Sequence, residues 1–190
     1  GHSVLGDYFK PQKMTQTISA SQSIQAQGQH GEDRFAAWLD RNGFGYVYIS
    51  QTQETFATLF HGDVKRPDFL VLLDSIGILA VDVKNYKASG GVLTLTWDTE
   101  ISRVLTFERI FRLPVWYAYL QEEEAGETWY WISALKAVEA GERRVNERRG
   151  EVFLAIDLVH FETIRSGEDL GKLFTHRLPG LSKIRAATSS

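Results

Sequence analysis

The stretch VKRPDFLVLLDSIGILAVDVKNY, which covers residues 64–86, places Asp68, Asp82 and Lys84 in or beside two apolar runs. Asp68 begins the first apolar run, and Asp82 and Lys84 lie at the end of the second. Oxygen ligands without histidine or cysteine suit Mg²⁺ or Mn²⁺ rather than zinc. A bound divalent ion lowers the pKa of its water and neutralises phosphate oxygens, and a neighbouring ammonium group adds electrostatic stabilisation. These residue types therefore suit metal-assisted hydrolysis of a phosphodiester.

Two strands must position these side chains. Residues 68–73 and 77–83 are largely apolar on both faces, which is typical of strands buried inside a sheet. Their short connection predicts a hairpin. Side chains two apart on a strand share a face and lie about 6.6 Å apart along it, so Asp82 and Lys84 are expected on one face. The alternative for this pair is an ion pair within a fraying strand end.

The pairing register decides whether the two aspartates meet. If residues 73 and 77 pair, Asp68 lies opposite Asp82, whereas a slip of one residue separates the faces, and the sequence leaves this choice open. Like charges opposed across strands destabilise a sheet, and burying them unpaired costs more. A divalent cation between the carboxylates would resolve the conflict. The alternative for Asp68 alone is an aspartate at a sheet rim after Pro67.

A third acid comes from a helix expected over residues 31–43, GEDRFAAWLDRNG. At about 100° per residue, Phe35 and Leu39 share an apolar stripe, and Glu32 falls in the middle of it. Glu32 should therefore point toward the sheet. The helix dipole offers another reason for an acid in a first turn, but it does not explain the inward direction.

The remaining elements complete a mixed sheet. A further helix is expected over residues 99–112 after Asp98 as its N-cap, and Ser133 is expected to cap a short helix. Further strands are expected at residues 46–50, 90–97, 115–120, 128–132 and 151–157. The order predicts an α/β (α+β) fold in which helices pack on a mixed β-sheet.

Composition limits the class of protein. The chain has 190 residues, a net charge of −3 and no cysteine, which excludes disulfides and thiolate zinc sites. No membrane segment or signal peptide is visible, so a cytoplasmic protein without membrane contact is expected. Residues 1–30 are interpreted as a tag remnant and a polar lead-in, which is either mobile or a surface helix. Residues 31–180 are expected to form one domain, with a core at 31–120 and an elaboration at 121–180, and residues 181–190 to form a tail.

Pro67-Asp68, a 13-residue gap and Asp82-Val83-Lys84, with Glu32 on a preceding helix, resemble the PD-(D/E)xK nuclease superfamily. The layout is most similar to the branch of archaeal Holliday-junction resolvases and related restriction-endonuclease-like nucleases. The resemblance covers about residues 31–120 and implies a core of helix, three strands, helix and strand (αβββαβ). Aspartate stands at position 82 where the superfamily more often has glutamate.

The resemblance implies a role for each residue of the motif. Asp68 and Asp82 would bind Mg²⁺ or Mn²⁺, with the carbonyl oxygen of Val83 as a further ligand. Glu32 would either bind the ion or orient a water molecule. Lys84 would position or deprotonate the attacking water, or stabilise the charge on the phosphate.

Basic side chains near the motif are candidates for contacts with DNA. Lys65 and Arg66 precede the first strand and Lys87 follows the second, so all three could bind phosphates, although exposed basic residues at strand ends are common. The densest basic cluster is Arg143, Arg144, Arg148 and Arg149. Because glutamates are interspersed there, a solvated, salt-bridged loop is the favoured interpretation.

Three hypotheses follow. The first is a metal-dependent endonuclease that cuts DNA. The second is a nuclease fold without chemistry that binds DNA or assembles with a partner. The third treats the acids as members of surface salt bridges. A double-strand cut would suit a homodimer, for which the aromatic strands between residues 115 and 132 are interface candidates, and a protein partner could supply targeting.

Overall fold

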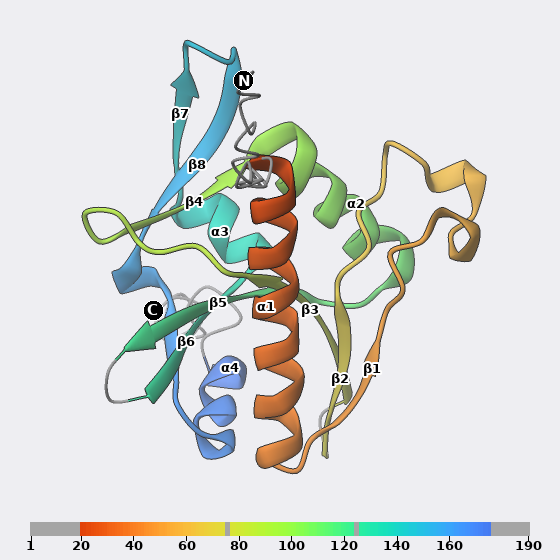
Figure 1. Ribbon diagram of the computed structural model, residues 1–190, viewed down its shortest axis with the longest axis vertical. Coiled ribbons are helices and arrows are strands. Elements are labelled where there is room, and N and C mark those ends of the chain that lie inside the picture. Colours follow the sequence, from red (N-terminus) through yellow and green to blue (C-terminus); the bar gives the residue numbers. More distant parts are fainter. Residues whose placement is uncertain (1–19, 75–76, 124–125, 176–190) are drawn as a thin grey trace, which may run out of the picture.

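The computed structural model describes residues 20–74, 77–123 and 126–175; the predicted tag remnant and tail lie outside the described residues. Its strands form two sheets, one of six strands in the order β1-β2-β3-β5-β6-β9 and one of three in the order β4-β8-β7 (Figure 1). The strands are β1 (Gly45–Tyr48), β2 (Phe69–Leu73), β3 (Gly77–Lys84), β4 (Val92–Thr96), β5 (Val115–Glu123), β6 (Gly126–Ser133), β7 (Glu142–Asn146), β8 (Glu151–Asp157) and β9 (Glu162–Ile164).

The helices flank the larger sheet, so the predicted α+β architecture is confirmed. They are α1 (Ala20–Arg41), α2 (Ser102–Phe111), α3 (Ala134–Ala140) and α4 (Lys172–Thr175). A π-helical turn, Trp97–Ile101, leads into α2. Short 3₁₀ turns occupy Gln53–Thr55, Thr58–Phe60, Leu158–His160 and Gly167–Gly171. The elements α1, β1, β2, β3, α2 and β5 follow one another in the predicted order, with β4 inserted before α2.

The predicted hairpin is confirmed, and the structure settles its register, which the sequence left open. Strands β2 and β3 are antiparallel, with Leu73 opposite Gly77 and Phe69 opposite Val81. Strand β5 then pairs with β3 in parallel, so β3 lies inside the sheet with a neighbour on each side. This central position explains why residues 79–84 are buried and why residues 79–81 are apolar on both faces.

Helix α1 begins at Ala20, well before the expected start at residue 31. Residues 20–30 are exposed, and the buried part of α1 begins at Gly31. The described part of the polar lead-in is therefore a surface helix, the second of the two alternatives. Although α1 spans 22 residues, neither it nor any other described helix has the length and apolar character needed to cross a membrane.

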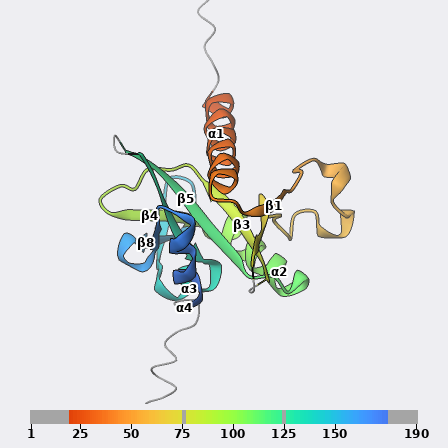
Figure 2. The ribbon, with the colours of Figure 1, turned by 90° about the horizontal axis from the view of Figure 1, so that it is seen from below.

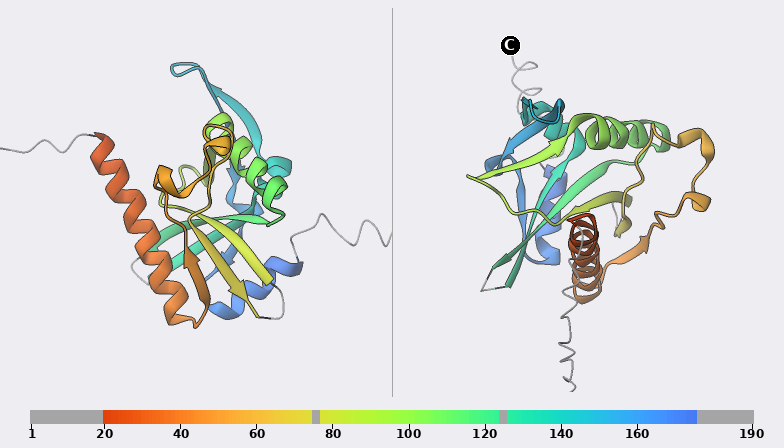
Figure 3. Two further views of the ribbon diagram at one scale, coloured as in Figure 1. Left: turned by 90° about the vertical axis from the view of Figure 1, so that its right-hand side faces the viewer. Right: turned by 45° about the horizontal axis from the view of Figure 1, so that its top comes forward.

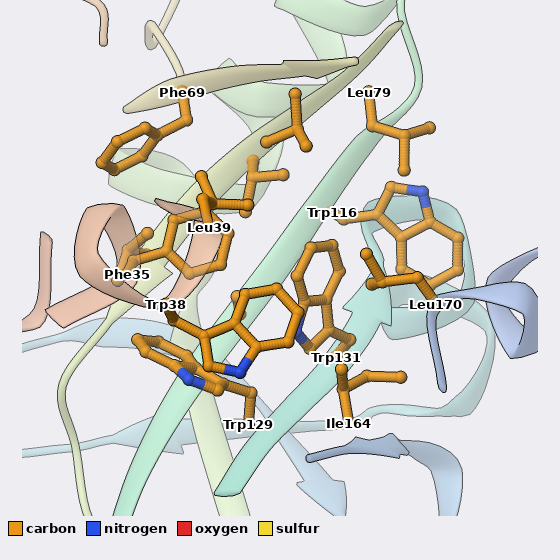
Figure 4. Packing of buried hydrophobic residues seen from close by; sticks show 14 of the residues in the cluster. Phe35, Trp38, Leu39, Phe69, Leu79, Trp116, Trp129, Trp131, Ile164 and Leu170 are labelled. Atoms are coloured by element: carbon orange, nitrogen blue, oxygen red, sulfur yellow. The ribbon is translucent and has the colours of Figure 1, made fainter. Parts of the chain in front are cut away.

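The six-stranded sheet carries a hydrophobic core on each face. On one face, Phe35 of α1 packs against Phe69, Trp129 and Trp131, with ring centroids 5.1 to 5.7 Å apart (Figure 4). On the other face, side chains of α2 and α3 cover β3 and β5. Figure 2 shows α1 on one side of these two strands, and α2 and α3 on the other.

The tryptophans of the aromatic strands belong to this core. Trp116, Trp129 and Trp131 are each at most 2% exposed. They are therefore not available for a contact between two copies of the chain, and the interface expected on these strands is not supported. Exposed apolar side chains lie instead on β1 and β2, at Val47 and Leu72.

The arginine-rich segment was expected to be a loop, but it forms a hairpin. Strand β7 carries Arg143 and Arg144 and pairs with β8, and the hairpin extends from the body of the molecule (Figure 3, left). The expected salt bridging is limited to one pair, Arg144 with Glu142 at 2.8 Å, among the ion pairs of the described residues in this segment. Arg143 instead lies over the Trp97 ring, 4.9 Å from its centroid.

Candidate active site

The observed register brings Asp68 and Asp82 next to each other. The ladder begins with Phe69 opposite Val81, and Asp68 directly precedes β2, where its N–H group donates to the Val81 carbonyl oxygen at 3.0 Å. The Asp68 side chain accepts a hydrogen bond from the Val83 N–H group at 2.8 Å. Both carboxylates are buried, with Asp68 8% and Asp82 0% exposed. The third hypothesis, surface salt bridges, does not fit this burial.

Asp82 lies within a compact cluster of charges. Lys65 Nζ contacts both carboxylate oxygens of Asp82, at 2.9 and 3.0 Å, and Lys84 Nζ contacts one of them at 2.8 Å. The two ammonium groups also share Glu100, at 2.7 Å from Lys65 and 2.9 Å from Lys84. Two positive and two negative side chains thus neutralise one another.

This cluster sets the charge states of its members. Burial alone would raise the pKa of Asp82, but the ammonium groups of Lys65 and Lys84 outweigh it and hold that pKa below its ordinary value. Burial would likewise lower the pKa of Lys84, but the carboxylates of Asp82 and Glu100 outweigh it and hold that pKa well above its ordinary value. In this arrangement Lys84 is held as a cation.

Asp68 is in the opposite situation. Burial, followed by the negative charge of Asp82 and a hydrogen bond with Glu32, raises the pKa of Asp68 well above its ordinary value. Glu32 also accepts a hydrogen bond from the Tyr48 hydroxyl group at 3.0 Å. Burial and this hydrogen bond raise the pKa of Tyr48 to about 12, so that Tyr48 stays a donor. Asp68 and Glu32 are therefore two adjacent acids beside the charge cluster of Lys65, Lys84, Asp82 and Glu100.

Glu32 comes from the middle of α1. Because α1 begins at Ala20, Glu32 is far from the first turn, and the helix dipole does not explain its position. The predicted direction toward the sheet is observed, since Glu32 reaches Tyr48 at the end of β1 and Asp68 before β2.

One pocket of about 210 Å³ lies beside Asp68 and the two lysines. Glu32, Lys65, Asp68, Val83 and Lys84 all line it. A second pocket, of about 300 Å³, shares two of the lining residues, Lys84 and Tyr86, and lies against β4 and the π-helical turn. The end of β3 therefore lies between the two pockets. Asp82 lines neither of them and is buried behind Lys65 and Lys84.

Glu100 was not among the residues predicted from the sequence. It lies in the π-helical turn, an irregular helix that is frequent at functional sites. A glutamate just after Asp98 at an expected helix start gives no local signal that separates it from an ordinary first-turn acid. Only the packing of this turn against β3 shows that Glu100 reaches Lys65 and Lys84.

The three basic residues expected to bind phosphate have different surroundings. Lys65 contacts Asp82 and Glu100, as described above. The guanidinium group of Arg66 donates to the carbonyl oxygens of Ser50 and Thr52, at 2.8 and 3.0 Å, and thereby holds that loop. Lys87 is exposed on the loop after β3. A phosphate contact by any of the three stays a prediction.

The carboxylates of the site have the chemistry that a divalent cation needs. Glu32, Asp68 and Asp82 supply the hard oxygen ligands that Mg²⁺ or Mn²⁺ prefers, and the raised pKa of Asp68 marks a place where negative charge lacks a partner. Within the described ranges, however, no group of three or more such side chains has the arrangement of a metal site. The chemistry of the residues fits the ion, while in this structure Lys65 contacts both oxygens of Asp82.

Helix α1 approaches the end of β3 closely, which positions Glu32. The side-chain amide of Asn85 donates to the Gln27 carbonyl oxygen at 2.9 Å, and the Gln27 amide donates to the Asn85 carbonyl oxygen. A Cβ atom at Gly31 would lie 2.9 Å from the Cβ atom of Asn85, a distance that side chains do not normally reach. Gly31 is therefore required by this contact, not by a helix end.

Gly31→Ala is expected to lower the free energy of unfolding by about 1 kcal/mol, because the overlap with Asn85 outweighs the gain in helix propensity. Gly28→Ala is a matched control three residues earlier on α1, where an added Cβ meets no atom within 4 Å. That variant should gain up to about 1 kcal/mol. Urea unfolding of both variants measures the difference, and equal stabilisation would contradict the described docking of α1.

No protein-family model matches the chain, and no curated protein matches it. Among solved structures, the chain is similar to D212, a nuclease from a fusselovirus, with 10% sequence identity and a TM-score of 0.43. The similarity covers 86% of this chain and 93% of the viral protein. At such values the likeness gives no information about the function of this chain.

Proposed function

We propose that the protein is a metal-dependent endonuclease that hydrolyses phosphodiester bonds in DNA. One observation supports this most strongly. Asp68, just before β2, lies near Asp82 of β3, and both carboxylates are buried. The Lys84 ammonium group lies 2.8 Å from Asp82 beside a pocket that Glu32 also lines. Buried like charges next to an open pocket are costly for a fold and are a common arrangement at catalytic sites.

Each residue has a role that its surroundings allow. Asp68, Asp82 and the Val83 carbonyl group would hold a Mg²⁺ or Mn²⁺ ion, which would supply an activated water molecule and neutralise phosphate charge. Glu32, held by Tyr48, would bind the ion or orient water. Lys84, kept positive by Asp82 and Glu100, would stabilise the charge that develops on the phosphate.

A second candidate is a DNA-binding or assembly module of the same fold without chemistry. The four-residue charge cluster favours it, since Lys65 and Lys84 neutralise Asp82 and Glu100 without a cation. Such a module would show DNA binding that weakens with salt and would show no cleavage.

Cleavage assays separate the two candidates. The purified protein is incubated with plasmid, linear, single-stranded and branched DNA in Mg²⁺, Mn²⁺ or EDTA. The endonuclease proposal predicts cleavage of at least one substrate that stops in EDTA. Absence of cleavage of every substrate at high protein concentration would contradict it, and salt-sensitive binding in the same samples would support the module.

Lys84→Met is expected to lower the cleavage rate by about 10²- to 10³-fold, because the transition state loses an ammonium group in a largely water-free site. Binding of Mn²⁺ should not weaken, since the ion loses only a like charge. Rates under single-turnover conditions and Mn²⁺ titration measure the two effects. Lys136→Gln, on α3, is the control; unchanged cleavage by Lys84→Met would remove Lys84 from the mechanism.

The oligomeric state and any targeting partner belong to the proposal as well. A double-strand cut requires two active sites, which suits a homodimer. Because the aromatic strands are buried within one chain, a dimer would need another surface. The mass in solution, with and without DNA, tests this expectation, and a monomer that cuts both strands would contradict it.

A further inference from the structure

The Lys65 ammonium group contacts two carboxylates, those of Asp82 and Glu100, and binding of phosphate would need neither contact. Its Nζ atom lies 2.9 and 3.0 Å from the two oxygens of Asp82 and 2.7 Å from Glu100. Asp82 is fully buried, whereas the Lys65 side chain is 26% exposed and lines the pocket beside Asp68. The ammonium group therefore lies between the pocket and the carboxylate that a metal ion would need.

The two lysines of the cluster differ in how easily they can move. Lys84 stands on the central strand β3, its side chain is 9% exposed, and its Nζ atom lies 5.9 Å from the Tyr117 ring centroid. Lys65 lies in the irregular segment before β2, and its backbone N–H group is held by the Arg103 carbonyl oxygen at 3.2 Å. With the backbone fixed, a rotation of the Lys65 side chain alone can remove its ammonium group from Asp82.

Glu100 provides a second partner for Lys65. The pair is already formed at 2.7 Å, and the Glu100 side chain is 22% exposed. If Lys65 left Asp82, it could keep this partner and would not become an unpaired buried charge, which would be costly. The displaced lysine would therefore stay in the site.

We propose that the Lys65 ammonium group occupies the cation position beside Asp82 and that a divalent cation must displace it toward Glu100. Lys65 is then a positioning residue that competes with the metal ion and sets the concentration at which the site fills. This inference rests on the proposed function, because it takes Asp82 as a metal ligand.

Mn²⁺ binding, measured by the loss of the electron paramagnetic resonance signal of the free ion, tests the proposal without DNA or turnover. Lys65→Gln should bind Mn²⁺ at least about tenfold more tightly than the unmodified protein, because a competing charge next to the ion is lost. Lys65→Arg keeps the charge and should not bind more tightly. Lys136→Gln removes a positive charge from α3 and should change the affinity less than twofold.

The outcomes separate this inference from the proposed function. Mn²⁺ binding that is lost in Asp82→Asn but unchanged in Lys65→Gln would overturn the role of Lys65 and leave the metal site intact. Absence of Mn²⁺ binding in the unmodified protein and in Lys65→Gln would overturn both. Tighter binding by Lys65→Gln without cleavage of any DNA would support the role of Lys65 and contradict only the endonuclease.

A second variant covers the case in which Lys65→Gln does not fold, as judged by circular dichroism. Glu100→Gln removes the alternative partner, so Lys65 should hold Asp82 more strongly and Mn²⁺ affinity should fall about threefold. An unchanged or higher Mn²⁺ affinity in Glu100→Gln would overturn the proposed displacement.

Discussion

Asp82→Asn is expected to abolish DNA cleavage, with a fall in rate of at least about 10³-fold. The carboxylate of Asp82 is fully buried and receives the ammonium groups of Lys65 and Lys84. Asparagine keeps the shape of the side chain but removes its charge. The proposed metal ion would therefore lose a ligand, and Lys84 would lose an ion-pair partner. The rate is measured at saturating Mg²⁺ on the DNA form that the unmodified protein cuts best.

Two controls make this result specific to Asp82. Asp74→Asn makes the same chemical change at an exposed position in the turn between β2 and β3 and should leave the rate within twofold. Thermal unfolding of both variants shows whether Asp82→Asn is still folded at the assay temperature. A folded Asp82→Asn variant that cuts DNA at the ordinary rate would remove Asp82 from the active site and would contradict the proposed chemistry.

Phe35→Ala is expected to lower the free energy of unfolding by about 3 to 5 kcal/mol, a large share of the stability of a domain of this size. Phe35 is fully buried where α1 meets the sheet, and its ring packs against Phe69, Trp129 and Trp131 (Figure 4). Alanine would leave a cavity that the surrounding rings are too rigid to fill. Chemical denaturation followed by tryptophan fluorescence measures the loss.

The control for Phe35→Ala removes a large apolar side chain from the surface. Leu59 is 83% exposed, so Leu59→Ala should change the free energy of unfolding by less than about 0.5 kcal/mol. If Phe35→Ala were as mild as Leu59→Ala, α1 would not be fixed on the sheet by this cluster. The position of Glu32 would then also be in doubt, since α1 carries it.

The sequence predicts the part of the site that local rules control. Apolar runs on both sides of a short turn predict the β2–β3 hairpin, and alternation along β3 puts Asp82 and Lys84 on one face. The register remained open, and the observed pairing of Leu73 with Gly77 selects the arrangement in which the aspartates meet.

The remaining features depend on contacts between segments that are distant in sequence. Strand β4 has ordinary strand composition, and nothing in it shows that it pairs with β8 in a separate sheet. From the sequence, Glu100 looks like an acid at a helix start and Lys65 like a basic residue at a strand end. Their ion pair joins segments 35 residues apart and has no local signal. Gly31 was interpreted as part of a helix start, but the approach of Asn85 determines it.

The proposed chemistry depends on one divalent cation held by Asp68 and Asp82 beside Glu32. Anomalous diffraction from a crystal soaked in Mn²⁺ tests it most directly. We predict one strong peak between the carboxylates of Asp68 and Asp82, with the Lys65 ammonium group moved toward Glu100. A structure at saturating Mn²⁺ in which no ion touches Asp82 and Lys65 still holds both of its oxygens would contradict the claim.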